Sequence, residues 1–159
     1  MSLTYDVDCS TIVALYEPNG TLRGPMVGDS TPYHWDGGIE GLGVPDVRNN
    51  DVELGHADGS VGQNDFYRPR IITLPLLIGD GGTDKAQSIA EWRALEAGWF
   101  KSMYDLTLSV TEPGPDHSFY YGRPNGITRD MTMFQNDETN LIRARIVIRC
   151  PNPLRYQGS

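Results

Sequence analysis

Three arginines near the end of the chain, Arg143, Arg145 and Arg149, are separated by two and four positions. Side chains alternate between the two faces of a strand, so these arginines share one face and the isoleucines between them share the other. A guanidinium group pairs with a carboxylate through two hydrogen bonds, so a row of arginines on a sheet suits contact with carboxylates of a neighbouring chain. A solvated outer face is the alternative interpretation.

Residues able to bind metals or catalyse reactions are scattered. The histidines are His34, His56 and His117. No two of them are spaced as ligands on one helix face or hairpin, and the proximity of His34 to Asp36 is expected by chance in an Asp-rich loop. The pairs Asp6 with Asp8 and Asp51 with Asp58 are typical of solvated loop carboxylates, with a weak calcium site as the alternative.

A glycine-rich segment at residues 37–43 resembles a phosphate-binding loop only in composition. It lacks the Lys-Ser/Thr pair of such loops and does not lie between a strand and a helix, which favours a flexible loop. The chain also lacks the Gly-x-Ser-x-Gly motif that carries the nucleophilic serine of many hydrolases. We therefore expect neither catalysis nor a bound cofactor or metal.

Length and charge limit the remaining possibilities. The 159 residues suffice for one domain with one core, and 18 glycines with 11 prolines indicate many short strands and turns. A net charge of -8 argues against binding to nucleic acid or anionic membranes. No apolar run is long enough for membrane insertion, and the first ten residues do not resemble an export signal, so we expect a soluble product made in the cytoplasm. Cys9 and Cys150 are then predicted to be free thiols, with a disulfide that joins the two ends of the chain as the alternative.

Residues 28–64 differ in character from the rest of the chain. They are rich in glycine and aspartate, and their large apolar residues are too few for a core: Tyr33, Trp35, Ile39 and Leu54. A structureless loop of this length is unusual inside a compact domain. We predict an extended arm that becomes ordered against another subunit, with those four residues at the interface; plain disorder is the alternative.

The remaining segments predict a mostly β fold with one helix. Strands are expected at residues 11–16, 66–78, 104–111, 118–123, 127–134 and 141–149. The first strand continues through an Asn-Gly turn into a hairpin, Pro75 places its strand at an edge or a bulge, and residues 123–126 form a turn. The helix begins at Thr83 or Asp84. Predicted core residues are Ile89, Trp92, Leu95 and Trp99 of the helix, with Ile142, Ile146 and Ile148 of the last strand.

The order of these parts resembles the N-terminal domain of siphophage distal tail proteins. The resemblance rests on the first hairpin, the glycine-rich arm, Arg68 to Ile72, the helix with Trp92 and Leu95, Gly122-Arg123-Pro124, and the exit from Pro153 to Tyr156. It implies a β-sandwich related to tail tube proteins, with a packed helix and an extended arm. Many members carry a second, C-terminal domain; since the resemblance covers only the first, host recognition is not among the functions it implies.

The resemblance also implies a function. Such a domain forms a homo-hexameric ring that joins the tail tube to the tip and hub proteins in the virion, with DNA passing through it without specific binding. We therefore predict that residues 1–159 are one ring-forming domain. A tail tube or tail terminator subunit is the alternative within the structural class. A carbohydrate-binding module is the second alternative, in which Tyr33, Trp35 and Tyr120 would stack on sugars.

Overall fold

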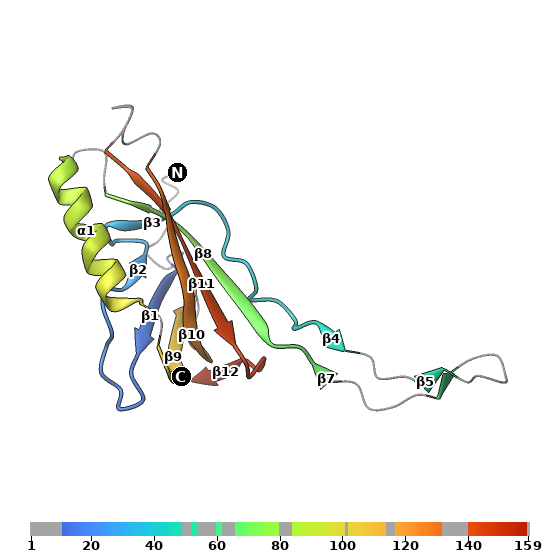
Figure 1. Ribbon diagram of the computed structural model, residues 1–159. Helices are drawn as coiled ribbons and strands as arrows, with labels where there is room; N and C mark the ends of the chain where they lie inside the picture. The colour runs from blue at the N-terminus through green and yellow to red at the C-terminus, as the bar shows by residue number, and fades with distance from the viewer. Residues whose placement is uncertain are drawn as a thin grey trace, which may run out of the picture.

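The computed structural model describes residues 11–48, 52–53, 60–61, 66–79, 84–100, 102–113, 117–131 and 140–158. One sheet of eight strands dominates this part of the chain, in the order β2-β1-β9-β10-β11-β8-β3, and β12 also pairs with β10 (Figure 1). The strands are β1 (Ile12–Tyr16), β2 (Val27–Gly28), β3 (Tyr33–Trp35), β8 (Arg70–Ile78), β9 (Leu106–Thr111), β10 (His117–Asp130), β11 (Ile142–Cys150) and β12 (Tyr156–Gly158).

Strand β10 belongs to both halves of a β-sandwich. Its first part pairs with β9 and β12, and its second part, from Arg123 onward, pairs with β11. The prediction of two strands separated by a turn at residues 123–126 is wrong, because β10 continues through this segment with a register shift between Pro124 and Gly126. The extra residue, Asn125, is accommodated as a bulge, which bends a strand without ending it.

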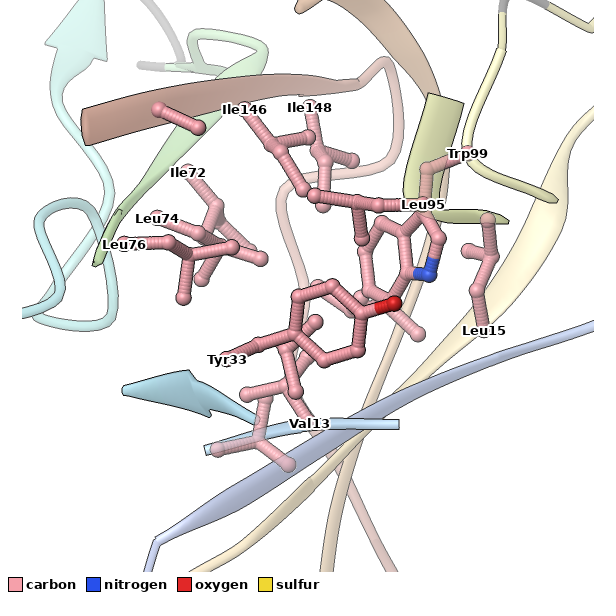
Figure 2. Packing of buried hydrophobic residues seen from close by; sticks show 14 of the residues in the cluster. Val13, Leu15, Tyr33, Ile72, Leu74, Leu76, Leu95, Trp99, Ile146 and Ile148 are labelled. Carbon is pink, nitrogen blue, oxygen red and sulfur yellow. The ribbon is translucent and has the colours of Figure 1, made fainter. Parts of the chain in front are cut away.

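The core lies between the two halves of the sheet and under the helix. Alternate residues of β8 and β11 are buried, as a period of two requires for strands with one covered face. Figure 2 shows Tyr33 among Leu76, Leu95 and Val13 in this cluster. The helical and strand residues expected in the core are buried except Ile89, which is half-buried against the cluster: Trp92, Leu95, Trp99, Ile142, Ile146 and Ile148.

Helix α1 (Lys85–Gly98) begins at Asp84, whose side chain accepts a hydrogen bond from the backbone N–H of Gln87 at 2.7 Å. This N-cap satisfies a donor that the first turn leaves free. At the other end, the indole N–H of Trp99 donates to the carbonyl of Pro25 at 2.9 Å. A Cβ atom on Gly24 would lie 2.6 Å from the Cα of Gly98, so glycine permits the close contact between this loop and the helix end.

Pro75 lies within β8 at a position where its missing N–H is tolerated. Strand β8 pairs with β11 along its whole length but with β3 over only three residues. The carbonyl of Pro75 accepts a hydrogen bond from the backbone N–H of Asp36 at 3.0 Å, on the side of β8 that faces β3. The N–H and C=O of one residue in an antiparallel strand point the same way. The donor that proline lacks would therefore face this short, nearly open edge and not β11.

The first part of the predicted arm belongs to the body of the protein. Strands β2 and β3 lie in the main sheet, and Glu40 bridges to Thr73 of β8. The segment from Val44 to Tyr67, which we call the projecting hairpin, extends away from the body where the structure describes it (Figure 1). It contains two short ladders, β4 (Val47–Arg48) with β7 (Phe66–Tyr67) and β5 (Val52–Glu53) with β6 (Ser60–Val61). The arm boundaries of 28 and 64 are thus corrected to 44 and 67.

Candidate assembly surfaces

The three arginines of β11 are exposed on the outer face of the sheet, opposite the buried isoleucines. The antiparallel register places each of them between a residue of β10 and a residue of β8. Arg143 lies between Asp130 and Leu77, Arg145 between Thr128 and Pro75, and Arg149 between Arg123 and Ile71. We call the surface formed by Arg143, Arg145 and Arg149 the arginine face.

The charges on and beside this face are unevenly compensated. Arg143 forms an ion pair with Asp36 at 2.8 Å, so its carboxylate partner is in its own chain and not, as expected, in a neighbour. Arg123 pairs with Asp105 at 3.0 Å. Within the described ranges, Arg145 and Arg149 form no ion pair or side-chain hydrogen bond. Two guanidinium groups are therefore free to meet carboxylates from outside the body.

The aromatic residues expected at a subunit interface lie mainly within the body. Tyr33 is only 4% exposed and its hydroxyl donates to the carbonyl of Glu91 at 2.8 Å, so its assignment to an interface is corrected to the core. Burial, followed by the charge of Glu91, raises the pKa of Tyr33 to about 12. The half-buried Trp35 donates its indole N–H to Thr11 at 2.9 Å, and Ile39 packs against the core. Leu54 lies outside the described residues.

These positions do not provide a sugar-binding platform. Stacking on a sugar requires exposed aromatic faces in one groove, as the carbohydrate-binding alternative assumes. Tyr33 and Tyr120 are instead buried, the latter with 1% of its surface exposed, and Trp35 is held by its hydrogen bond to the backbone. The three residues named for that alternative therefore cannot act together as a sugar-binding surface.

The buried side chain of Arg70, which was not among the predicted site residues, holds the base of the projecting hairpin. Arg70 is 6% exposed and donates to three backbone carbonyls, those of Gly41, Gly43 and Pro153. Its guanidinium also lies 5.1 Å from the centre of the Tyr120 ring, a favourable distance for a cation–π contact. Arg70 thereby joins the segment that enters the hairpin, the strand that leaves it and the end of the chain.

A signal for Arg70 exists in the sequence. In the alternation of β8, residue 70 falls on the same face as Ile72 and Leu74, so a charged residue occupies an inward position. Such a residue needs hydrogen-bond acceptors, because an arginine stays charged when buried. The glycine-rich segment supplies two of them. A Cβ atom on Gly41, whose φ is +91°, would lie 2.0 Å from the carbonyl oxygen of Ile71, so this glycine serves close packing against β8.

Apolar side chains are exposed around the same base. Val44 is 87% exposed, and Tyr67 and Leu154 are about half-exposed. A pocket of about 370 Å³ opens here between the hairpin and the end of the chain. Its lining residues include Leu42, Pro45 and Arg155 in addition to these three. Exposed apolar surface of this kind around a projecting segment is typical of a site of association with another protein.

The predicted metal and thiol residues occupy separate environments. His34 is exposed, and Nδ1 of His117 lies 3.2 Å from the hydroxyl of Thr111. In the described part of the chain, no three His, Cys, Asp or Glu residues are grouped as metal ligands. Cys150 is a buried free thiol, and burial raises its pKa to about 11. Six other residues that the sequence analysis considered lie outside the described ranges: Asp6, Asp8, Cys9, Asp51, His56 and Asp58.

Comparisons with known proteins give a match in structure alone. Neither known protein families nor curated proteins match the sequence. The fold is similar to the crystal structure of the Dit protein of phage SPP1, described as a paradigm of the hub adsorption apparatus in phages that infect Gram-positive bacteria, with a TM-score of 0.65 and 14% sequence identity. The match covers 93% of this chain and 52% of the SPP1 protein, so the chain spans about half of that protein's length. No helix in the described ranges is long and apolar enough to cross a membrane.

Proposed function

We propose that this chain is a structural protein of a phage tail tip, and that it acts by assembly and not by catalysis. The observation that supports this most strongly is the likeness in fold to the SPP1 Dit protein over almost the whole chain. In this proposal, residues 1–159 are one ring-forming domain, and six copies join the tail tube to the hub of the tip. The protein is made in the host cytoplasm and resides in the virion.

The projecting hairpin supports assembly into a closed ring. A two-stranded hairpin without a covering layer is at best marginally stable in water. Val47 and Tyr67 near its base are 46% and 52% exposed, so the isolated chain leaves apolar surface uncovered there. A hairpin that packs on a different surface of the next copy makes a head-to-tail contact, and such contacts close into a ring when the rotation between copies permits.

The overall charge fits the passage of DNA through such a ring. Proteins bind duplex DNA mainly through lysine and arginine, which displace counterions from the phosphates. The chain has a net charge of -8 and would repel the phosphates of passing DNA. In this proposal, its protein partners are the tail tube protein on one side of the ring and hub proteins on the other.

Native mass spectrometry of the purified chain tests the ring. Six chains of 17.6 kDa give a particle of about 106 kDa, and electron microscopy should show a ring with six-fold symmetry. A chain that remains at 17.6 kDa up to several hundred micromolar would contradict the proposal.

A shortened variant tests the role of the hairpin. Residues 48–66 are replaced by Asn-Gly, which keeps the paired Val47 and Tyr67 and closes them with a favoured two-residue turn. We expect a folded monomer, because none of the described residues of the replaced segment belongs to the core cluster of the body. Thermal unfolding followed by circular dichroism checks the fold, and light scattering checks the mass. Rings formed by the shortened chain would show that the hairpin is dispensable.

A further inference from the structure

The pocket at the base of the projecting hairpin has a buried cation in its wall. Arg70 lines this pocket and is only 6% exposed. Its Nε donates to the carbonyl of Pro153 at 3.0 Å, and its Nη1 donates to the carbonyls of Gly41 and Gly43. An arginine side chain carries five N–H donors, so these contacts leave over the two donors of Nη2.

The Nη2 group of Arg70 has no hydrogen-bond acceptor among the residues that the structure describes. It is not sealed inside the protein either, because the one enclosed side-chain atom without a hydrogen bond in the described ranges is Oε2 of Glu91. An arginine stays charged when it is buried, and a donor without an acceptor in so buried a group is unfavourable. An acceptor that enters from outside would therefore be bound.

Two pockets meet at Arg70, and they differ in charge. The larger one, of about 370 Å³, also has Arg155 in its wall, and none of its described lining residues is acidic. The smaller one, of about 220 Å³, contains Asp46. Arg155 is exposed and forms no ion pair within the described part of the chain. The larger pocket thus combines two cations without a carboxylate partner, which suits an acidic ligand.

Exposed apolar side chains line the same pocket from two directions. Val44 and Tyr67, at the base of the hairpin, are 87% and 52% exposed, and Leu154, at the end of the chain, is 47% exposed. An inorganic anion would leave this apolar surface uncovered, whereas a peptide can cover it. In an extended peptide, every second side chain points to the same face. One acidic residue can therefore enter the pocket while apolar residues two positions before and after it contact these side chains.

We propose that this pocket binds an extended segment of another protein, in which an acidic residue has an apolar residue two positions away on either side. The carboxylate accepts hydrogen bonds from Nη2 of Arg70 and pairs with Arg155. The apolar residues cover Val44 and Tyr67 on one side and Leu154 on the other. Charge-assisted hydrogen bonds are short and directional, so they set the position of the segment. That the bound protein is another tail component rests on the proposed function, while the site itself does not require the ring.

A TROSY NMR titration of the full chain with synthetic peptides tests the site. The probe is N-acetyl-Gly-Leu-Ser-Glu-Ser-Leu-Gly-amide. We expect it to shift the signals of the backbone amides of Gly43 and Val44 and of the Nε–H of Arg70. A matched peptide with glutamine in place of glutamate should bind at least about 10-fold more weakly, because it lacks the charge. A peptide with serine in place of both leucines should also bind about 10-fold more weakly, because it lacks the apolar contacts.

Substitutions in the protein locate the bound peptide. Arg155→Gln removes the exposed cation of the pocket and should weaken binding of the glutamate peptide about 5-fold. The control Arg68→Gln removes a nearby exposed arginine that does not line the pocket, and it should bind as the wild type does. Arg70→Lys keeps the charge but lacks Nη2, so it should weaken binding more than Arg155→Gln does. Circular dichroism checks that each variant folds, and Arg155→Gln provides the test if Arg70→Lys does not.

The results separate this site from the proposed ring. If no peptide shifts these signals at concentrations up to about 2 mM, the pocket does not bind such a segment. Equal binding of the glutamate and glutamine peptides would mean that the carboxylate is not recognised. Equal binding by Arg155→Gln and the wild type would place the peptide outside the pocket. Native mass spectrometry without peptide tests the ring alone, so a chain that fails to assemble can still bind the peptide, and a chain that assembles can fail to bind it.

Discussion

Arg70 is the residue on which the base of the projecting hairpin depends. It is buried, no described carboxylate pairs with it, and its charge is stabilised by backbone carbonyls and by the ring of Tyr120. Replacement by methionine keeps the length of the side chain but leaves the carbonyls of Gly41, Gly43 and Pro153 without this donor. We expect Arg70→Met to lower the free energy of unfolding by about 3 kcal/mol in urea titrations.

Two further variants identify the cause of that loss. Arg70→Lys keeps the charge but lacks the fork that reaches several acceptors, so an intermediate loss is expected. Arg68→Met removes a nearby exposed arginine and should change the free energy of unfolding by less than about 0.5 kcal/mol. Equal stability of Arg70→Met and the wild type would show that the carbonyl contacts contribute nothing.

Cys150 should make stability depend on alkaline pH. Its thiol has a pKa of about 11 in the folded chain because burial disfavours the thiolate, against an ordinary value of 9.0. As the pH rises, the thiol of the unfolded chain loses its proton before the buried thiol of the folded chain does. The contribution of the protonated thiol to the free energy of unfolding is therefore complete below about pH 9 and is lost as the pH rises toward 11. By pH 10 we expect the free energy of unfolding to have fallen by about 1 kcal/mol because of this thiol.

The measurement compares urea unfolding at pH 8 and pH 10 in a Cys9→Ser background. The additional substitution Cys150→Val removes the titrating group. The decrease in the free energy of unfolding between pH 8 and pH 10 should therefore be about 1 kcal/mol smaller in this variant. Tyrosines that do not interact with Cys150 contribute equally to both proteins and cancel in the comparison, whereas the pKa of Tyr120 is raised mainly by burial and in part by the charge of Cys150. An identical pH dependence with and without Cys150 would mean that its thiol is not shielded from solvent.

Residue types predicted burial better than they predicted contacts. The alternation in β11 correctly separated its arginines from its isoleucines, since period alone decides which face a side chain occupies. The same reasoning could not identify Asp36 as the partner of Arg143, because the two residues meet only when β3 packs beside β8. The scarcity of large apolar residues in residues 28–64 predicts an interface position for Tyr33, while the alternation in β3 turns its side chain toward the core.

At the scale of elements, helix α1 depends on the residue that caps its N-terminus. The carboxylate of Asp84 caps the N-terminus of α1 through the N–H of Gln87. Asp84→Ala should lower the free energy of unfolding by about 1 kcal/mol, and Asp84→Asn, which keeps an acceptor at the same position, should lower it less. Chemical denaturation of the three proteins at pH 7 checks this. Equal losses for alanine and asparagine would mean that the cap acts through charge alone.

The elements that the sequence predicted best are those with local signals. The Asn-Gly turn after β1 is present, with Gly20 at a φ of +87° and its N–H donating to Glu17. The helix and the strands of the core also follow their patterns. The Pro-Asn-Gly sequence predicts a turn at residues 124–126 but is also compatible with a bulge, and only the pairing of β10 with β11 across this segment distinguishes the two.

At the scale of the whole molecule, charge governs what the chain binds. The exposed arginines of β11 could suggest a nucleic-acid site, but they stand in a chain with a net charge of -8. We expect no binding of labelled duplex DNA in anisotropy titrations at 150 mM salt. Micromolar binding that disappears in a variant with Arg145→Glu and Arg149→Glu would instead assign these arginines to DNA.

The pairing of β1 with β9 has a consequence for how the protein is made. Ile12 pairs with Thr111, 99 residues later, so the first strand emerges from the ribosome long before its partner. At about 5–20 residues per second, β1 waits several seconds with only the short β2 beside it. The projecting hairpin is likewise synthesised before β10 and β11. Each chain therefore completes its hairpin before the strands that form its own arginine face exist.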